Sequence, residues 1–81
     1  MKVKVLYFAG AREIVAKGEE IMEVKDGASL DDFSAALFRA YPGLGKLAGS
    51  VRFSVNLEVA GGRTTLHESD VVGVLPPVAG G

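Results

Sequence analysis

The stretch SLDDFSAALFRAY, residues 29–41, decides the fold because it predicts the clearest helix of the chain. Ser29 is a favoured N-cap residue, and Asp32 stands three positions later in a variant of the capping box. Pro42 and Gly43 follow directly and predict the end of the helix. Spacings of three and four residues place the large apolar side chains on one side of the helix: Leu30, Phe33, Leu37 and Tyr41.

Segments on both sides of this helix alternate between apolar and polar residues, which is typical of strands. Before the helix, residues 2–8 and 19–25 predict two strands, and residues 9–17 predict a connector with one helical turn. After the helix, residues 43–50 predict a loop and residues 51–59 predict a third strand.

The remaining sequence predicts two further strands. Gly61 and Gly62 form a hairpin signal, which predicts a turn into a short strand at residues 63–65. Residues 71–75 are apolar and predict the last strand. Two prolines follow this strand and end regular structure, because proline cannot donate a ladder hydrogen bond.

The order of elements predicts an α+β domain, with a mixed sheet of about five strands and one main helix on one face. Two antiparallel hairpins joined by a helical crossover form a β-grasp, the ubiquitin-like fold. A right-handed crossover places the first and last strands side by side in the middle of the sheet. We expect this domain to span residues 1–75 and an extended, flexible tail to span residues 76–81.

Composition excludes several classes of protein. Nine basic and ten acidic residues give a net charge of −1, which argues against a nucleic-acid partner. The 81 residues include no cysteine, so disulfides, thiolate metal sites and cysteine nucleophiles are excluded. No apolar stretch approaches the length of a membrane span, and no leader pattern precedes the first strand. We therefore expect a cytoplasmic protein with no membrane partner.

The tail is the most informative segment. Pro76 and Pro77 hold the backbone extended, Val78 and Ala79 have small to medium side chains, and Gly80-Gly81 has none. This thin rod could carry the carboxylate of Gly81 into a narrow tunnel. The alternative is a frayed terminus, but the last eleven residues contain no charged side chain, unlike most frayed ends.

Four motifs resemble the family of molybdopterin synthase small subunits, and the resemblance spans nearly the whole chain. The ending Leu75-Pro76-Pro77-Val78-Ala79-Gly80-Gly81 is the most specific of them. Ala79 is a departure, since many members of the family have Ser or Thr there. The other three motifs are Lys4-Val5-Leu6-Tyr7-Phe8-Ala9, Arg12-Glu13 and Val55-Asn56.

The resemblance implies that this chain is a non-catalytic sulfur-donor subunit of an enzyme complex. An adenylating, ubiquitin-activating-like enzyme would use ATP to activate Gly81, and a sulfur donor would convert it to a thiocarboxylate. The tail would then enter the large synthase subunit of a heterotetramer and give sulfur to cyclic pyranopterin monophosphate, which forms the molybdopterin dithiolene. The chain alone would bind no cofactor and no metal.

The sheet has one helix and therefore one open face, where apolar side chains often mark a partner surface. We expect Phe8 and Leu75 to anchor the large subunit, with Leu6 and Val59 extending the patch and Arg12 steering an acidic partner. The alternative is that loops cover these residues or that they are ordinary scattered surface apolar residues.

Other interpretations remain open from the sequence. Carriers for thiamine, cysteine or tRNA thiolation would use the same chemistry with other acceptors, and a protein modifier would join Gly81 to a lysine. A plain interaction domain would leave the tail inert. His67 is expected on the surface, and the acidic group Glu19, Glu20 and Glu23 is expected along a solvated strand edge.

Overall fold

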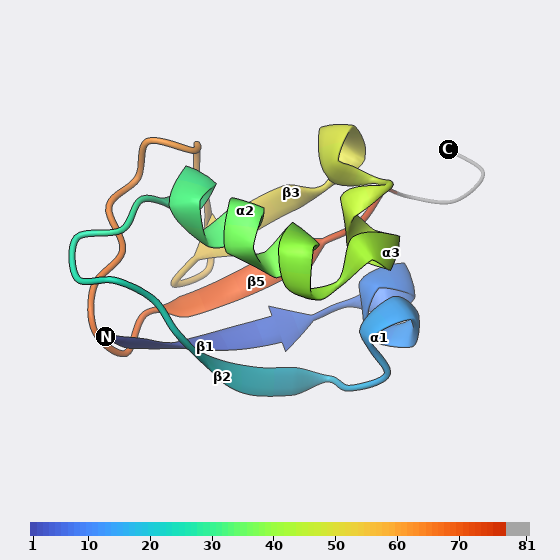
Figure 1. Cartoon of the computed structure of the whole chain (residues 1–81), viewed down its shortest axis with the longest axis horizontal. Helices are drawn as coiled ribbons and strands as arrows, with labels where there is room; N and C mark the ends of the chain where they lie inside the picture. The colour runs from blue at the N-terminus through green and yellow to red at the C-terminus, as the bar shows by residue number, and fades with distance from the viewer. Residues whose placement is uncertain (78–81) are drawn as a thin grey trace.

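Strands β1 (Lys2–Tyr7) and β5 (Val71–Leu75) lie side by side and parallel in the computed structural model, which describes residues 1–77 (Figure 1). β2 (Glu19–Glu23) pairs antiparallel with β1, and β3 (Arg52–Val55) pairs antiparallel with β5. β4 (Glu58–Val59) completes the strand order β2-β1-β5-β3-β4. The central pairing of the first and last strands confirms the expected β-grasp topology.

Helix α2 (Leu30–Ala40) crosses one face of the sheet (Figure 1). Three shorter helical segments gather at the end of the sheet where β5 ends: α1 (Ala9–Val15), α3 (Pro42–Gly45) and the 3-10 helix η1 (Ala48–Ser50). Within residues 1–77, no helix covers the opposite face of the sheet, so that face is open.

The core lies between α2 and the sheet. Phe33 of α2 packs edge-on against Phe53 of β3, with 6.0 Å between the ring centroids. Burying one side chain of this kind contributes about 1.5–3 kcal/mol, so a register shift that exposed this face would be strongly unfavourable. The side chains that are almost fully buried in these two layers are Val3, Val5, Tyr7, Val72, Val74, Leu30, Phe33 and Leu37.

The start of α2 is as the sequence predicts. The Asp32 N–H donates to Ser29 Oγ at 3.1 Å, and the Ser29 N–H donates to Asp32 Oδ2 at 3.0 Å, which completes the capping box. The loop before β5 satisfies two further N–H groups of the first turn, because Leu30 donates to Thr64 and Asp31 to Gly62. This loop therefore holds the helix N-terminus over the sheet.

The prediction of a hairpin at Gly61-Gly62 is wrong: a turn forms there, with Thr64 N–H donating to the Gly61 carbonyl at 3.0 Å, but it joins no pair of strands. The chain turns earlier, at Asn56 and Leu57, whose φ angles of 51° and 74° are those of a two-residue hairpin of type I′. Leu57 therefore lies at the tip of the hairpin and is 91% exposed, instead of sharing a strand face. Gly62 has another role: a Cβ there would collide with the Asp31 carboxylate, so a side chain would block the approach of the loop to α2.

Two segments are more helical than expected. Residues 43–50, predicted as a loop, contain most of α3 and all of η1, because Leu44 is fully buried and anchors α3 against the core. The connector at residues 9–17 forms the seven-residue helix α1 instead of a single turn, with Ala11 and Val15 buried.

The predicted strand at residues 63–65 is reduced to one bridge between Ser29 and Thr65. In the range that the structure describes, no helix is long and apolar enough to cross a membrane.

Candidate functional site: the open face of the sheet

The open face carries most of the side chains that the sequence singled out for docking. Val3, Val5 and Tyr7 point to the core, so Leu6 points away from α2. The register of β5 and β3 places Leu75 on the same face, and β4 places Val59 there beside Ser54. Val59 is 77% exposed, whereas Leu6 and Leu75 are partly buried.

Phe8 joins this face from the first residue after β1. Its N–H donates to the Val74 carbonyl at 3.3 Å, and its backbone is extended where it caps α1. The ring of Phe8 lies over Gly73 of β5: a Cβ at Gly73 would stand 3.2 Å from Phe8 Cε2 and would collide with Ser54 Oγ. The missing side chain at Gly73 therefore allows the Phe8 ring, 44% exposed, to lie on the sheet.

Two residues of this face escaped the sequence-based prediction. Ile21 of β2 is 60% exposed and points to the same side as its cross-strand neighbour Lys4. Gly73 is the other residue. A glycine inside an apolar strand often marks a place where another group packs closely on the backbone, so its position in the sequence could have indicated this contact.

The tail begins at this face. Leu75 pairs with Arg52 of β3, and Pro76 and Pro77 follow at the end of β5. Arg12 lies on α1, where its guanidinium stands beside Gly18, 3.2 Å from the position of a Cβ there. The guanidinium of Arg12 thus lies against the turn between α1 and β2. The predicted tail residues Val78, Ala79, Gly80 and Gly81 lie outside the described residues.

The expectation that Glu19, Glu20 and Glu23 all lie solvated along a strand edge is wrong for Glu20, which is partly buried and hydrogen-bonded. The hydroxyls of Tyr7 and Tyr41 donate to Glu20 Oε2 at 2.5 and 2.6 Å, and Lys17 Nζ lies 3.6 Å from Oε1. Partial burial alone would raise the pKa of Glu20, but the two hydrogen bonds and the charge of Lys17 outweigh it and lower that pKa. Burial and the bond to Glu20 raise the pKa of Tyr7.

A second polar cluster lies at the end of the sheet where β5 begins. Asn56 donates to Asp70 Oδ1 at 2.9 Å and accepts from the Val71 N–H at 3.0 Å. Asp70 Oδ2 also accepts from the His67 N–H at 2.8 Å, while the His67 imidazole is exposed. The hydrogen bond from Asn56 is the main cause of a lowered pKa of Asp70. These contacts fix the hairpin against β5 and leave His67 on the surface, as expected.

The remaining side chains offer little catalytic chemistry. Among residues 1–77, no group of three or more His, Asp or Glu side chains could hold a metal ion. The partly buried Glu20 is occupied by hydrogen-bond donors from two tyrosines. The arrangement is therefore a partly apolar open face next to the start of the tail.

The amino-acid sequence is similar to those of known proteins over nearly its full length. A family model described as the ThiS family matches residues 5–81. The molybdopterin synthase sulfur carrier subunit of Chlamydomonas reinhardtii is 35% identical over 83 residues, which cover 100% of both chains. Small archaeal modifier protein 3 of Haloferax volcanii is 35% identical over 92 residues, again covering 100% of both.

The fold is also that of solved structures. A putative molybdopterin converting factor, subunit 1, from Pyrococcus furiosus superposes with a TM-score of 0.87 at 30% identity. The match covers 96% of this chain and 99% of that one, which confirms the ubiquitin-like β-grasp over nearly the full length.

Proposed function

Because this chain belongs to the ThiS family, we propose that it is the sulfur-carrier subunit of a molybdopterin synthase. One observation carries the proposal: relatives of that name match this chain from end to end. The family match continues through residue 81 and so includes the whole tail. A family shared over the tail as well as the domain supports a role for the tail itself.

The proposed chemistry takes place at the carboxylate of Gly81. A carboxylate is a poor electrophile, so an adenylating partner would use ATP to convert it to an acyl-adenylate with release of pyrophosphate. The sulfur of a donor would then attack the acyl carbon and displace AMP. A hydrosulfide donor would leave the thiocarboxylate directly, whereas a persulfide donor would leave an acyl disulfide that a thiol must reduce to the thiocarboxylate. This chain has no cysteine, which is consistent with a sulfur that is carried on the backbone terminus.

The open face of the sheet would position the tail for sulfur delivery to the large subunit. Leu6, Phe8, Leu75 and Val59 would dock on the large subunit, and Arg12 would contact an acidic group at the margin. The six residues from Pro76 to Gly81 can extend about 20 Å from the sheet, far enough to enter a buried site. There the thiocarboxylate would transfer its one sulfur atom to cyclic pyranopterin monophosphate, and water would return Gly81 to a carboxylate. Two such transfers would supply the two sulfurs of the dithiolene, in a heterotetramer that works in the cytoplasm.

Intact-mass measurement tests this proposal. The chain is incubated with an adenylating enzyme of this class, ATP and a sulfur donor, and we expect exchange of one oxygen for sulfur at Gly81. Deletion of Gly81 should abolish the exchange while the unfolding temperature stays the same, because the core ends at β5. A truncated chain that still supports molybdopterin formation would contradict the proposal.

A second candidate is a protein modifier. The specific observation in its favour is the 35% identity with small archaeal modifier protein 3 of Haloferax volcanii. A modifier would form isopeptide adducts with lysines of other proteins, whereas a carrier would release its sulfur and return unmodified. Carriers for thiamine, cysteine or tRNA thiolation would give the same mass change, and they are distinguished by the acceptor that receives sulfur.

A further inference from the structure

Strand β2 is an edge strand with open backbone groups. Met1 and Val24 exchange two backbone hydrogen bonds of 2.8 Å, which fixes the alternation along the β1–β2 ladder. The N–H and C=O groups of Ile21 and Glu23 therefore point away from β1. Within residues 1–77, none of these four groups has a hydrogen-bond partner, so the edge can accept another strand.

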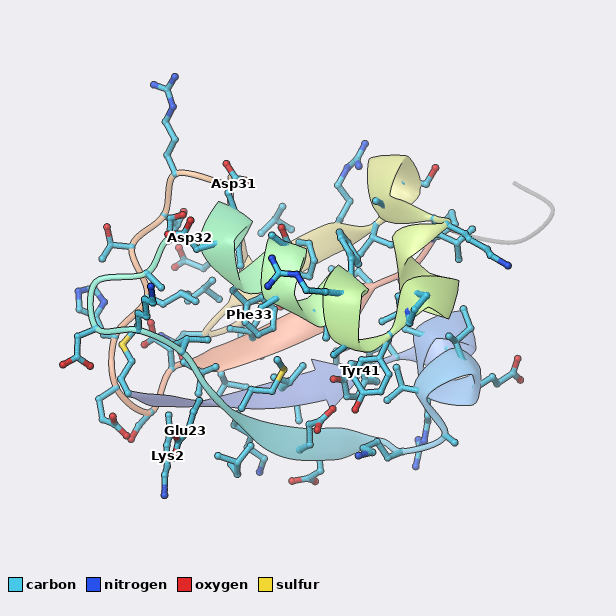
Figure 2. All side chains as sticks on the ribbon, viewed as in Figure 1. Lys2, Glu23, Asp31, Asp32, Phe33 and Tyr41 are labelled. Atoms are coloured by element: carbon cyan, nitrogen blue, oxygen red, sulfur yellow. The ribbon has the colours of Figure 1, made fainter. Side chains whose placement is uncertain are left out.

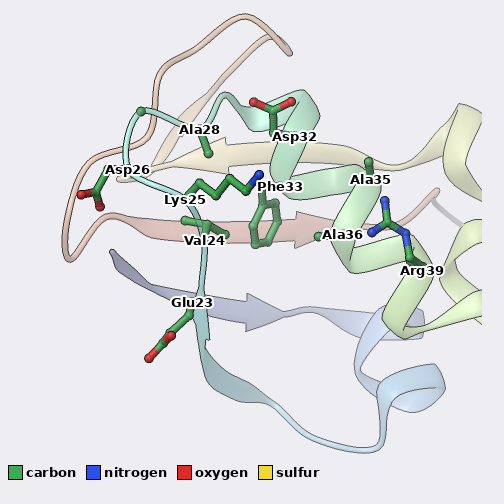
Figure 3. A pocket seen from close by; sticks show the side chains of 11 residues that line it. Glu23, Val24, Lys25, Asp26, Ala28, Asp32, Phe33, Ala35, Ala36 and Arg39 are labelled. Carbon is green, nitrogen blue, oxygen red and sulfur yellow. The ribbon is translucent and has the colours of Figure 1, made fainter.

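A groove of about 560 Å³ lies beside this edge, between α2 and the segment that leaves β2 (Figure 3). Its apolar lining comes from both sides: Val24, Ala28, Phe33, Ala35 and Ala36. A strand that paired with β2 would project alternate side chains to the two faces of the sheet. One set of side chains would lie over Ile21 on the open face, and the other would face the groove.

The charges of the groove favour an acidic occupant. Lys25 and Arg39 line it, are exposed, and have no ion pair among the described residues. The lining also contains three carboxylates, of which two have other partners. Asp32 completes the capping box and is a charge neighbour of Lys25, and Asp26 pairs with the N-terminal ammonium at 3.1 Å, so Arg39 is the cation with the least acidic company. Figure 3 shows Glu23 pointing away from the groove, whereas Lys25 reaches toward α2.

We propose that β2 and this groove bind an extended apolar and acidic segment of a partner protein as a sixth strand. Backbone hydrogen bonds to Ile21 and Glu23 would give affinity, and pairing with Lys25 and Arg39 would give specificity. Figure 1 shows that β2 ends far from the end of β5, where the tail begins. The segment can therefore bind while the tail is engaged elsewhere, so this surface adds a partner to the proposed sulfur carrier.

The probe is a short synthetic peptide with alternating valine and aspartate residues, titrated into the full chain and followed by amide NMR. We expect shifts at residues 21–25 and 35–39, with slower hydrogen exchange of the Ile21 and Glu23 amides. Lysine in place of aspartate, or N-methylation of the peptide backbone, should abolish these shifts. Equal binding of all three peptides, or no shift with the aspartate peptide, would overturn the proposal.

Charge reversal locates the site on the protein. The double substitution K25E/R39E should weaken binding of the aspartate peptide on the order of tenfold, because two exposed attractions become repulsions. The matched control is K46E, which reverses an exposed lysine just after α3 and should leave affinity unchanged. A larger effect of K46E, or shifts centred on Phe8 and Leu75, would place binding elsewhere. The experiment needs no activation of Gly81, so its outcome is independent of the proposed function.

Discussion

Tyr41, the residue after α2, donates a hydrogen bond of 2.6 Å to Glu20 on the edge strand β2. Figure 2 shows Tyr41 at the end of the helix beside β2. Tyr7 donates to the same carboxylate oxygen at 2.5 Å, so one acceptor ties the edge strand to both layers of the core. Its nearest cation, Lys17, is exposed and adds a weaker, solvent-screened attraction.

This arrangement predicts a pH dependence. The pKa of Glu20 is lowered from its ordinary value of 4.5, so its contribution to stability is present above pH 4.5 and is lost as pH falls through the folded-state pKa. Glu20→Gln should cost about 1 kcal/mol at neutral pH and flatten the acid limb of the stability curve. Thermal unfolding at a series of pH values measures both effects. Glu19→Gln is the control, since Glu19 makes only an exposed ion pair with Lys4. If the Glu20→Gln variant lost stability between neutral and acidic pH as steeply as the unsubstituted protein, this role of Glu20 would be contradicted.

Gly73→Ala should destabilise the protein by about 1 kcal/mol, because the new methyl group would displace Ser54 Oγ and press on the Phe8 ring. Adding Ser54→Ala should restore most of the loss, because it removes the harder of the two collisions. Chemical unfolding of the single and double variants measures the coupling. Simple additivity of the two substitutions would show that Ser54 and Gly73 are not packed as described.

Phe8→Ala and Leu75→Ala should each weaken binding to a molybdopterin synthase large subunit by roughly tenfold, as expected for anchors of an interface. Calorimetry or surface plasmon resonance measures the affinity. Leu57→Ala is the control, because Leu57 is equally apolar but lies on the hairpin tip, at the end of the sheet where β5 begins and not where Leu75 lies. If all three substitutions weakened binding equally, the open face would not be the docking surface.

Leu57→Gly should stabilise the fold by about 1 kcal/mol. Leu57 has a φ angle of 74°, a left-handed conformation that is costly for leucine and free for glycine, and its exposed side chain contributes little packing. Asn-Gly is also the favoured pair for a type I′ turn. The midpoint of chemical unfolding measures the gain. As a contrast, Asn56→Gly should destabilise, since it removes the hydrogen bonds to Asp70 and Val71.

The sequence predicted the parts of the fold that local patterns specify. The apolar spacing and capping box of residues 29–41 predicted α2, alternation predicted β1, and an apolar run predicted β5. The hairpin was misplaced because Gly61-Gly62 is a stronger turn signal than Asn56-Leu57. Helix α3 was missed because tertiary burial of Leu44, and not local propensity, holds it.

The site was predictable to a similar degree. Leu6, Phe8 and Leu75 could be assigned to one face because side chains alternate along a strand. The Glu20 cluster could not, since its tyrosines stand 13 and 21 residues away in sequence and meet it only through tertiary packing. The chemistry proposed at Gly81 rests on the family resemblance, because a terminal carboxylate has no periodic pattern of its own.

The central position of β5 has a mechanical consequence. A partner that pulls on the tail pulls on the strand that is hydrogen-bonded on both sides, to β1 and to β3. Because β1 and β5 are parallel, tension between the two chain ends loads their shared ladder in shear, so its bonds must break together and not one after another. If a partner draws the tail into a narrow channel, as proposed, the pull would act on the strand that is best placed to resist it.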